Sequence, residues 1–179
     1  MEKYDYLKDT WERLPNMPKK NMFVSACVSN DNIIVSGGIN HVTGEFSDEI
    51  YIYIKGTWSQ VGRLTRARYG HSSIVFDNKI WFVGGHADIN ESHSQSVEVF
   101  DLSLKRYEVG PPMCVARIWH RLFVINDLLY AVGGDSLISR SLPVIFFSLI
   151  FSNTYFYFII HIEILILLHE FTPFLHIEH

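Results

Sequence analysis

Double glycines recur along the chain at a nearly constant interval. The pairs are Gly37-Gly38, Gly84-Gly85 and Gly133-Gly134, which lie 47 and 49 residues apart. An aromatic residue follows the same spacing, at Trp11, Trp58 and Tyr107. A period near 50 residues is typical of an array of one supersecondary unit, in which each copy buries its apolar face only against its neighbours. The chain is therefore expected to fold as a set of stacked repeats.

Each repeat reads as four short strands. In the central copy, the apolar run 71–76 and the alternating run 79–83 flank Asp77-Asn78, whose residue types tolerate positive φ, so we expect a hairpin. The double glycine then lets the backbone leave the sheet, and a polar loop leads to a third strand at 96–100 and a fourth around Tyr107. The first copy has matching runs at 23–28, 33–36 and 50–53, and the last copy has them at 121–125 and 128–132.

Further residues recur at fixed offsets. Arg68 precedes His71 as Arg117 precedes His120, and the segments 2–5 and 98–101 share acidic ends. Together with the double glycines and the fourth-strand aromatics, this pattern resembles the kelch repeat, the four-stranded blade of kelch β-propellers. The resemblance covers about residues 1–135. It implies an all-β partial propeller of about three four-stranded antiparallel blades, with the apolar C-terminal residues 136–179 as a tail.

Three positions depart from the pattern. Asn21 stands where the other copies have Arg68 and Arg117, Val24 stands at the position of His71, and Tyr107 stands where the other copies have tryptophan. We interpret all three as ordinary drift, because a packing position needs volume more than one exact side chain.

Segments 11–18 and 109–113 are most similar to those of the kelch-like adaptors. Those proteins carry BTB and BACK domains before the propeller and present substrates to a cullin-3 ubiquitin ligase. The resemblance implies a protein-binding module for substrate recognition, with the ligase reached only through BTB and BACK domains that this sequence lacks. The alternative is a structural or scaffold module that binds cytoskeletal partners or is held at a membrane by the C-terminal segment.

The repeat phase leaves blades incomplete at both ends of the pattern. It opens at residue 2 inside a third strand and breaks after Gly134, where another third strand is due. Unpaired strand edges invite pairing with other strands. We therefore expect these edges to be completed by further blades or covered by something else.

The composition changes after Gly134. Residues 141–179 contain no Lys or Arg, and residues 142–168 form an almost unbroken apolar and aromatic tract. One interpretation is a transmembrane tail anchor, with Arg140 on the cytoplasmic side, although Asn153, His161 and Glu163 interrupt the tract. A second is a translated intron or frame-shifted segment. A third is extra structure that packs on the open propeller edge.

Charge and cysteine content exclude some classes of function. A net charge of -4 gives no basic surface for nucleic acid. Cys27 and Cys114 belong to no C-x-x-C pair, so neither zinc nor a disulfide framework is indicated. The first residues carry no apolar signal region. A cytoplasmic location is expected, with a tail-anchored membrane location as the alternative.

No set of residues predicts a reaction. The histidines His41, His71, His86, His93 and His120 show no H-E-x-x-H spacing, and a metal site needs three or four convergent ligands. Some kelch-family proteins use copper with a Tyr-Cys crosslink or use iron, but neither ligand set can be placed here. We expect no enzyme, no metal and no cofactor.

A partner-binding surface is the remaining expectation. In kelch-like adaptors, ligands face the loops between blades and the loops after the double glycines. The matching positions here are Arg63, Arg66, Arg68 and Arg117 in the former and Asn40, His86 and Asp135 in the latter. An arginine fork suits a carboxylate or phosphate on a partner peptide. Arg68 and Arg117 recur, which favours a framework role for them, whereas Arg63 and Arg66 do not recur and are the better candidates for contact.

Overall fold

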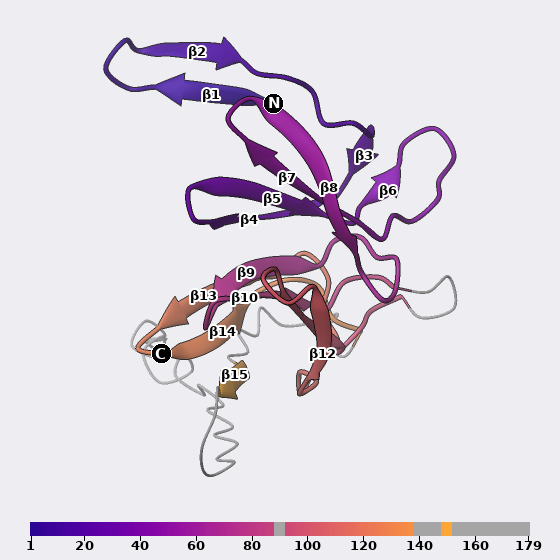
Figure 1. Ribbon diagram of the computed structural model, residues 1–179. Helices are drawn as coiled ribbons and strands as arrows, with labels where there is room; N and C mark the ends of the chain where they lie inside the picture. The colour runs from indigo at the N-terminus through magenta and orange to yellow at the C-terminus, as the bar shows by residue number, and fades with distance from the viewer. Residues whose placement is uncertain (88–91, 138–147, 152–179) are drawn as a thin grey trace, which may run out of the picture.

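The chain folds into consecutive antiparallel sheets. The computed structural model describes residues 1–87, 92–137 and 148–151. Within these ranges every regular element is a β-strand (Figure 1). The all-β fold and the partial propeller expected from the sequence are thereby confirmed.

Two complete four-stranded sheets form the centre of the array. The first blade contains β4 (Ser25–Ser29), β5 (Asn32–Ser36), β7 (Glu49–Ile54) and β8 (Thr57–Arg63), paired in that order. The second blade contains β9 (Ser72–Phe76), β10 (Lys79–Val83), β11 (Val97–Asp101) and β12 (Arg106–Gly110), also paired in that order. Each strand thus pairs antiparallel with the next strand of its blade, as in a propeller blade.

The hairpin turns explain why these runs pair as they do. The first two strands of each blade are joined by two residues that both have positive φ, namely Asn30-Asp31, Asp77-Asn78 and Asn126-Asp127. Two successive residues of positive φ make the turn whose twist matches that of the strands it joins, and Asn and Asp tolerate this conformation. The sequence therefore fixes the register of each inner hairpin.

Two incomplete sheets flank the complete blades along the chain. The third blade contains β13 (Arg121–Ile125), β14 (Leu128–Val132) and β15 (Ser148–Phe151), and the N-terminal hairpin contains β1 (Glu2–Asp5) and β2 (Thr10–Arg13). Strand β15 comes from the apolar tail and pairs with β14 antiparallel, Leu129 opposite Ile150, as β11 pairs with β10. A tail segment thus occupies the third-strand position at which the repeat pattern breaks.

The rest of the tail, residues 138–147 and 152–179, lies outside the described residues, and so does most of the suggested transmembrane segment 142–168. In the ranges that the structure describes, no helix is long and apolar enough to cross a membrane.

A short pairing that the sequence did not predict closes the loop end of each blade. Strand β3 (Asn21–Met22) pairs with β6 (Ile39–Asn40), so that Met22 lies opposite Ile39. At the matching positions of the later blades, single bridges join Tyr69 to His86 and Ile118 to Asp135. Each pairing ties the residue after a double glycine to the segment that enters the same blade.

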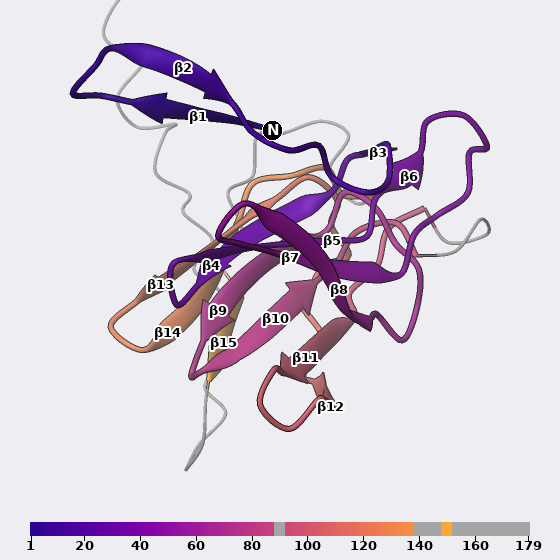
Figure 2. The same ribbon diagram turned by 45° about the horizontal axis from the view of Figure 1, so that its top comes forward.

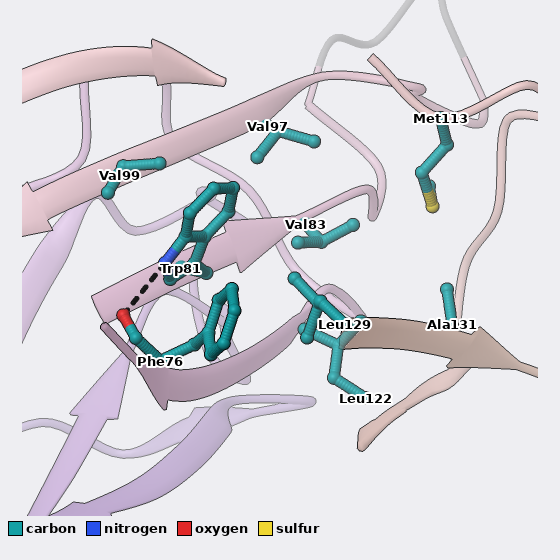
Figure 3. Packing of buried hydrophobic residues seen from close by; sticks show 9 residues of the cluster. All are labelled: Phe76, Trp81, Val83, Val97, Val99, Met113, Leu122, Leu129 and Ala131. Atoms are coloured by element: carbon teal, nitrogen blue, oxygen red, sulfur yellow. Dashed lines mark hydrogen bonds between the residues drawn. The ribbon is translucent and has the colours of Figure 1, made fainter. Parts of the chain in front are cut away.

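The apolar core lies between the blades. The first strands β4, β9 and β13 lie side by side, so the blades stack as in Figure 2. At the first interface, between the first and second blades, the buried cluster is Ile34, Ile50, Ile52, Leu64, Ile80, Phe82 and Phe100. At the second interface, between the second and third blades, it is Phe76, Trp81, Val83, Val97, Val99, Met113, Leu122, Leu129 and Ala131 (Figure 3). The two faces of the second blade therefore supply both cores.

Candidate functional site

Two of the predicted arginines are buried and join neighbouring parts of the array. Arg68 is fully buried; its Nη1 donates to the Gly84 carbonyl at 2.9 Å and to Ser96 Oγ at 3.0 Å, and its Nη2 is paired with Glu98. Burial lowers the pKa of Arg68, and the Glu98 carboxylate opposes this shift. The Arg68 carbonyl also accepts the Gly38 N–H of the first blade at 2.8 Å. Arg68 therefore links two blades and is not exposed to a partner.

Arg117 repeats this geometry 49 residues later. Its Nη1 donates to the Gly133 carbonyl at 2.8 Å, and its own carbonyl accepts the Gly85 N–H at 2.8 Å. It is also buried. These contacts describe a framework role, which is the alternative that the recurrence of the two arginines favours.

Asn21 keeps the same hydrogen bond with a shorter side chain. Its Nδ2 donates to the Gly37 carbonyl at 3.1 Å, the counterpart of the Gly84 and Gly133 carbonyls. Nearby, Lys19 Nζ lies 3.1 Å from Glu49, whose carbonyl accepts the Gly37 N–H as the Ser96 carbonyl accepts that of Gly84. Position 21 therefore needs a side chain that can donate a hydrogen bond to the glycine carbonyl, and side-chain volume alone does not explain the residue found there.

The aromatic residues of the fourth strands also make polar links between blades. Trp58 Nε1 donates to the Pro15 carbonyl at 3.1 Å, and the Tyr107 hydroxyl accepts the Arg63 N–H at 3.1 Å. Both bonds reach the chain that leaves the preceding fourth strand. The replacement of tryptophan by tyrosine thus reverses the donor and the acceptor and keeps the link, which the drift interpretation had missed.

Two histidines line the interfaces beside the double glycines. His71 Nε2 lies 2.8 Å from Ser36 Oγ of the first blade, whereas the two ring nitrogens of His120 have no hydrogen-bond partner among the described residues. Burial, followed by the nearby Arg68 and His120, lowers the pKa of His71 to about 3. Burial, followed by Arg117 and Arg121, lowers the pKa of His120 to about 4. Both rings are therefore neutral at neutral pH.

The remaining predicted arginines are exposed. Arg63 Nη1 lies 2.7 Å from Asp48 Oδ1 and its Nη2 lies 3.7 Å from Glu49, so its guanidinium is held by carboxylates of its own blade. Arg66 is exposed on the loop between β8 and β9. Arg66 also keeps a contact within the chain.

The loops after the double glycines place the other predicted residues at one end of the blades. Asn40 Oδ1 accepts the N–H groups of Val42 and Thr43 at 2.8 and 3.1 Å and so shapes its own loop. Asp135 Oδ2 lies 3.6 Å from His93 Nε2, which joins the second-blade loop to the third blade. By register, His86 and Asp135 are counterparts of Ile39, one residue before Asn40.

His86 belongs to a group of rings that sequence reasoning did not find. We call this group the aromatic cluster; its members are Phe23, Phe46, Tyr69, His86 and Trp119. The Tyr69 and His86 rings stack with centroids 4.9 Å apart, and Tyr69 Oη lies 3.2 Å from His86 Nδ1. Phe46 packs edge-on against both rings, at 4.9 and 5.1 Å. The cluster continues from Tyr69 to Phe23 at 6.0 Å and from Phe23 to Trp119 at 6.3 Å.

Phe23 and Trp119 form the open part of the aromatic cluster. Their side chains are 52% and 54% exposed, and they occupy matching positions just before β4 and β13. Gly70 stands at the same position before β9, and all three have positive φ, 55°, 62° and 60° in chain order. Positive φ is unfavourable for bulky residues, and such strain gathers at functional sites. The array thus holds two exposed aromatic side chains in a costly conformation.

Backbone hydrogen bonds fix this arrangement across three blades. The Gly70 N–H donates to the Phe23 carbonyl at 2.9 Å, and the Trp119 N–H donates to the Gly70 carbonyl at 2.7 Å. A side chain at Gly70 would collide with Ile118 and with the Trp119 indole. Glycine therefore leaves room for Trp119 and Phe23 to meet above it. The equal spacing of positions 23, 70 and 119 was the signal in the sequence that could have found them.

In the ranges with described side chains, no three His, Cys, Asp or Glu side chains come together as metal ligands. Cys114 is exposed, and burial raises the pKa of Cys27 to about 11.

Comparison with known proteins agrees with the repeat geometry. The Kelch motif family matches residues 67–113, from the loop before the second blade to the segment after β12. The chain is 30% identical over 138 residues to Kelch-like protein 23 of Homo sapiens, covering 75% of this chain and 24% of that protein. It is 25% identical over 133 residues to Kelch-like protein 36 of Rattus norvegicus, covering 74% of this chain and 22% of that protein. The chain thus spans about a quarter or less of the length of these relatives.

Proposed function

Because this chain is a kelch-repeat protein whose blades expose an aromatic cluster at their loop end, we propose that it binds another protein through that cluster. The finer proposal is substrate recognition of the kind that kelch-like adaptors perform for a cullin-3 ubiquitin ligase. In this proposal the chain selects the substrate, and segments outside this sequence contact the ligase. The proposed setting is the cytoplasm.

The observation that carries the proposal is the exposure of Phe23 and Trp119 under backbone strain. Large aromatic side chains dominate the binding energy of protein interfaces, because they bury much apolar area at a small cost in side-chain entropy. Their positions come from three different blades together with Tyr69 and Phe46, so only the assembled array presents them as one surface. A partner that covers both rings would bury apolar surface that water now meets.

Polar groups around the aromatic cluster suit recognition of a peptide. Tyr69 and His86 contribute a hydroxyl and a ring nitrogen at the partly buried floor. Arg66, three residues before Tyr69 on the same loop, is exposed and suits an acidic group of the partner. An interface with an apolar centre and a polar rim has this composition.

The proposal is tested with a variant that preserves the backbone. In Phe23→Gly/Trp119→Gly both positions receive the residue that position 70 already has, so the positive φ is kept without strain. The wild-type chain and this variant are each fused to a promiscuous biotin ligase and expressed in cells. We expect a set of proteins labelled by the wild type to fall at least fivefold for the variant.

The matched control is Val109→Ser, which changes an exposed apolar residue on β12, outside the aromatic cluster. It should label the same proteins as the wild type. Equal labelling by the wild type and the glycine variant would refute the proposed binding face.

The finer proposal is tested by joining the chain to the BTB and BACK segment of a kelch-like adaptor. The labelled proteins should then be ubiquitinated with the wild-type chain and not with the glycine variant.

A further inference from the structure

The fourth strand of the first blade carries one residue that the second blade lacks. Gly62 of β8 comes four residues after Trp58, whereas its counterpart by register, Gly110 of β12, comes three residues after Tyr107. The extra residue is Val61, which has no partner on β7 and makes a β-bulge in that pairing. A bulge bends its strand and often lies beside a functional site, where it re-aims side chains.

A hollow of about 480 Å³ lies beside this bulge, between the outer strands of the first two blades. Strand β8 supplies residues 60–63 of its lining. The second blade supplies Phe100 from β11, Lys105 from the following turn and Tyr107 from β12. A volume of this size falls within the range of small-molecule sites in proteins.

The Tyr107 side chain lies close against β8 and keeps a free donor. A Cβ at Gly62 would meet Tyr107 Oη at 3.1 Å and the Phe100 ring at 3.2 Å, so glycine is needed for this approach. The Tyr107 hydroxyl accepts the Arg63 N–H, but its own hydrogen has no acceptor among the described residues. Burial raises the pKa of Tyr107, so the hydroxyl keeps its proton at neutral pH and can donate it to a ligand.

The charges around the hollow leave one cation available. Two carboxylates lie near it, and each already has a partner: Asp48 pairs with Arg63, and Glu98 pairs with Arg68. The hollow itself is lined by no Asp or Glu of the described chain. Lys105 is exposed, and its side chain makes no ion pair or hydrogen bond with the residues that the structure describes. The lining therefore combines hydrogen-bond donors with one uncompensated positive charge.

We propose that this hollow binds a small organic acid, with the carboxylate between Lys105 Nζ and the Tyr107 hydroxyl and the apolar body against Val61. The ammonium and the hydroxyl would each donate a charge-assisted hydrogen bond. One uncompensated cation matches a carboxylate better than a phosphate, which carries close to two negative charges at neutral pH. The Gln60 amide adds a donor, because its bond to the Gly62 carbonyl is long at 3.5 Å. The hollow shares no residue with the aromatic cluster, so this proposal does not depend on the proposed function.

Binding is tested by amide NMR of the isotope-labelled full chain during titration with para-ethylbenzoate. The amides of Val61, Gly62 and Tyr107 should shift and saturate in the millimolar range. The neutral probe para-ethylbenzamide has the same apolar body and should bind roughly fivefold or more weakly, because it cannot accept a charge-assisted bond. If these amides showed no saturable shift, or if the two probes bound equally, the proposal would be wrong.

Lysine variants test the position of the carboxylate. Lys105→Met should weaken binding of para-ethylbenzoate roughly fivefold or more, whereas Lys105→Arg keeps the charge and should stay within about twofold of the wild type. Lys55→Met is the matched control and should bind like the wild type. Lys55 is an exposed lysine in the turn before β8, with a φ of 46° against 49° for Lys105, and it does not line the hollow.

Two results of this series would overturn the proposal. Equal affinities of Lys105→Met and Lys55→Met for para-ethylbenzoate would show that Lys105 does not hold the carboxylate. Tighter binding of the peptide acetyl-Gly-Gly-Phe than of para-ethylbenzoate, with the same amides shifted, would assign the hollow to a peptide end and not to a small acid.

Discussion

The two interfaces between blades share one backbone plan and differ in how they satisfy polar side chains. At both, an arginine donates to the first glycine carbonyl of its blade and its own carbonyl accepts the N–H of the second glycine of the preceding blade. At both, a histidine lies against the first glycine of that preceding blade. The repeated residues thus build the same joint twice.

The first interface adds side-chain hydrogen bonds to this plan. Ser36 lies 2.8 Å from His71 Nε2, Ser25 Oγ lies 2.8 Å from Ser73 Oγ, and Glu98 pairs with Arg68. At the second interface the residue in the place of Ser36 is Val83, which has no polar group, and it belongs to an apolar cluster with Trp81 and Met113. One joint is therefore partly polar and the other largely apolar. The difference shows that the repeated residues determine the backbone contacts between blades. Whether buried polar side chains find hydrogen-bond partners depends on the residues between the repeated positions.

The largest effect is expected at the buried ion pair of the first interface. Glu98→Leu should lower the free energy of unfolding by about 3–5 kcal/mol, because it leaves the Arg68 guanidinium buried without its carboxylate. The double variant Glu98→Leu/Arg68→Met should recover most of this loss, since neither charge is then buried alone. Urea unfolding followed by fluorescence measures both. If the double variant were no more stable than Glu98→Leu, the unpaired charge of Arg68 would not be the cause of the loss, and the prediction would be wrong.

Acid should weaken both interfaces through their histidines. The folded-state pKa values of about 3 for His71 and about 4 for His120 lie below the ordinary value of 6.5. Between these values the unfolded chain binds protons that the folded chain does not, so stability rises with pH there. Each histidine should remove up to about 1.4 kcal/mol per pH unit as the pH falls below 6.5.

Single variants divide this acid effect between the interfaces. His71→Phe and His120→Phe should each flatten the fall in unfolding free energy between pH 6.5 and 5, and the double variant should nearly abolish it. The measurement is urea unfolding at several pH values. An unchanged slope in the double variant would mean that carboxylates, and not the buried rings, control acid stability.

Exchanging the polar partners of the histidines should make the interfaces more alike. Ser36→Val leaves His71 Nε2 buried without a partner and should cost about 1–3 kcal/mol. Val83→Ser offers His120 a partner at the cost of apolar volume, so its net effect should stay within about 1.5 kcal/mol. Thermal unfolding compares the two. If Val83→Ser cost clearly more than Ser36→Val, the account of the second interface as an apolar version of the first would fail.

The smallest effect is expected at the outer rim of the first interface. Tyr107→Phe removes the hydroxyl that accepts the Arg63 N–H and should cost about 0.5–1.5 kcal/mol. Gln60→Ala, on the same rim, removes a side chain whose hydrogen bond to the Gly62 carbonyl is long at 3.5 Å and should cost less. Chemical unfolding of both variants measures their free energies of unfolding. Equal decreases in the two variants would show that the Tyr107 hydrogen bond does not stabilise the first interface.

The fold was largely predictable because its signals are periodic and local. The double glycines and the Asn and Asp turns require positive φ, and the apolar runs between them alternate, so the inner strands were predicted to within a residue or two. The pairing of β14 with β15 was not predictable, because residues 148–151 carry none of the repeated residues. The short bridges at the loop end were missed because one or two residues give no periodic pattern.

The candidate site was predictable only in part. His86 was placed correctly in the loops after the double glycines, but its ring partners are Phe46 and Tyr69, whose proximity depends on how two blades stack. Phe23 and Trp119 were missed because nothing in an aromatic residue beside a strand signals positive φ. The hydrogen bonds of Asn21 and Tyr107 were missed because a link that recurs between blades can be made by different donors and acceptors.

Hydrogen exchange of single amides tests the central account most directly, namely that one joint is built twice between stacked blades. The amides of Gly38 and Gly70 report on the first interface, and those of Gly85 and Trp119 report on the second, since each donates across an interface. Measured by NMR on the full chain, all four should exchange at least a hundredfold more slowly than an unstructured amide, and Glu98→Leu should speed the first pair more than the second. Rapid exchange of Gly85 and Trp119 beside slow exchange of Gly38 and Gly70 would contradict the account, because the third blade would then not be joined as the second is.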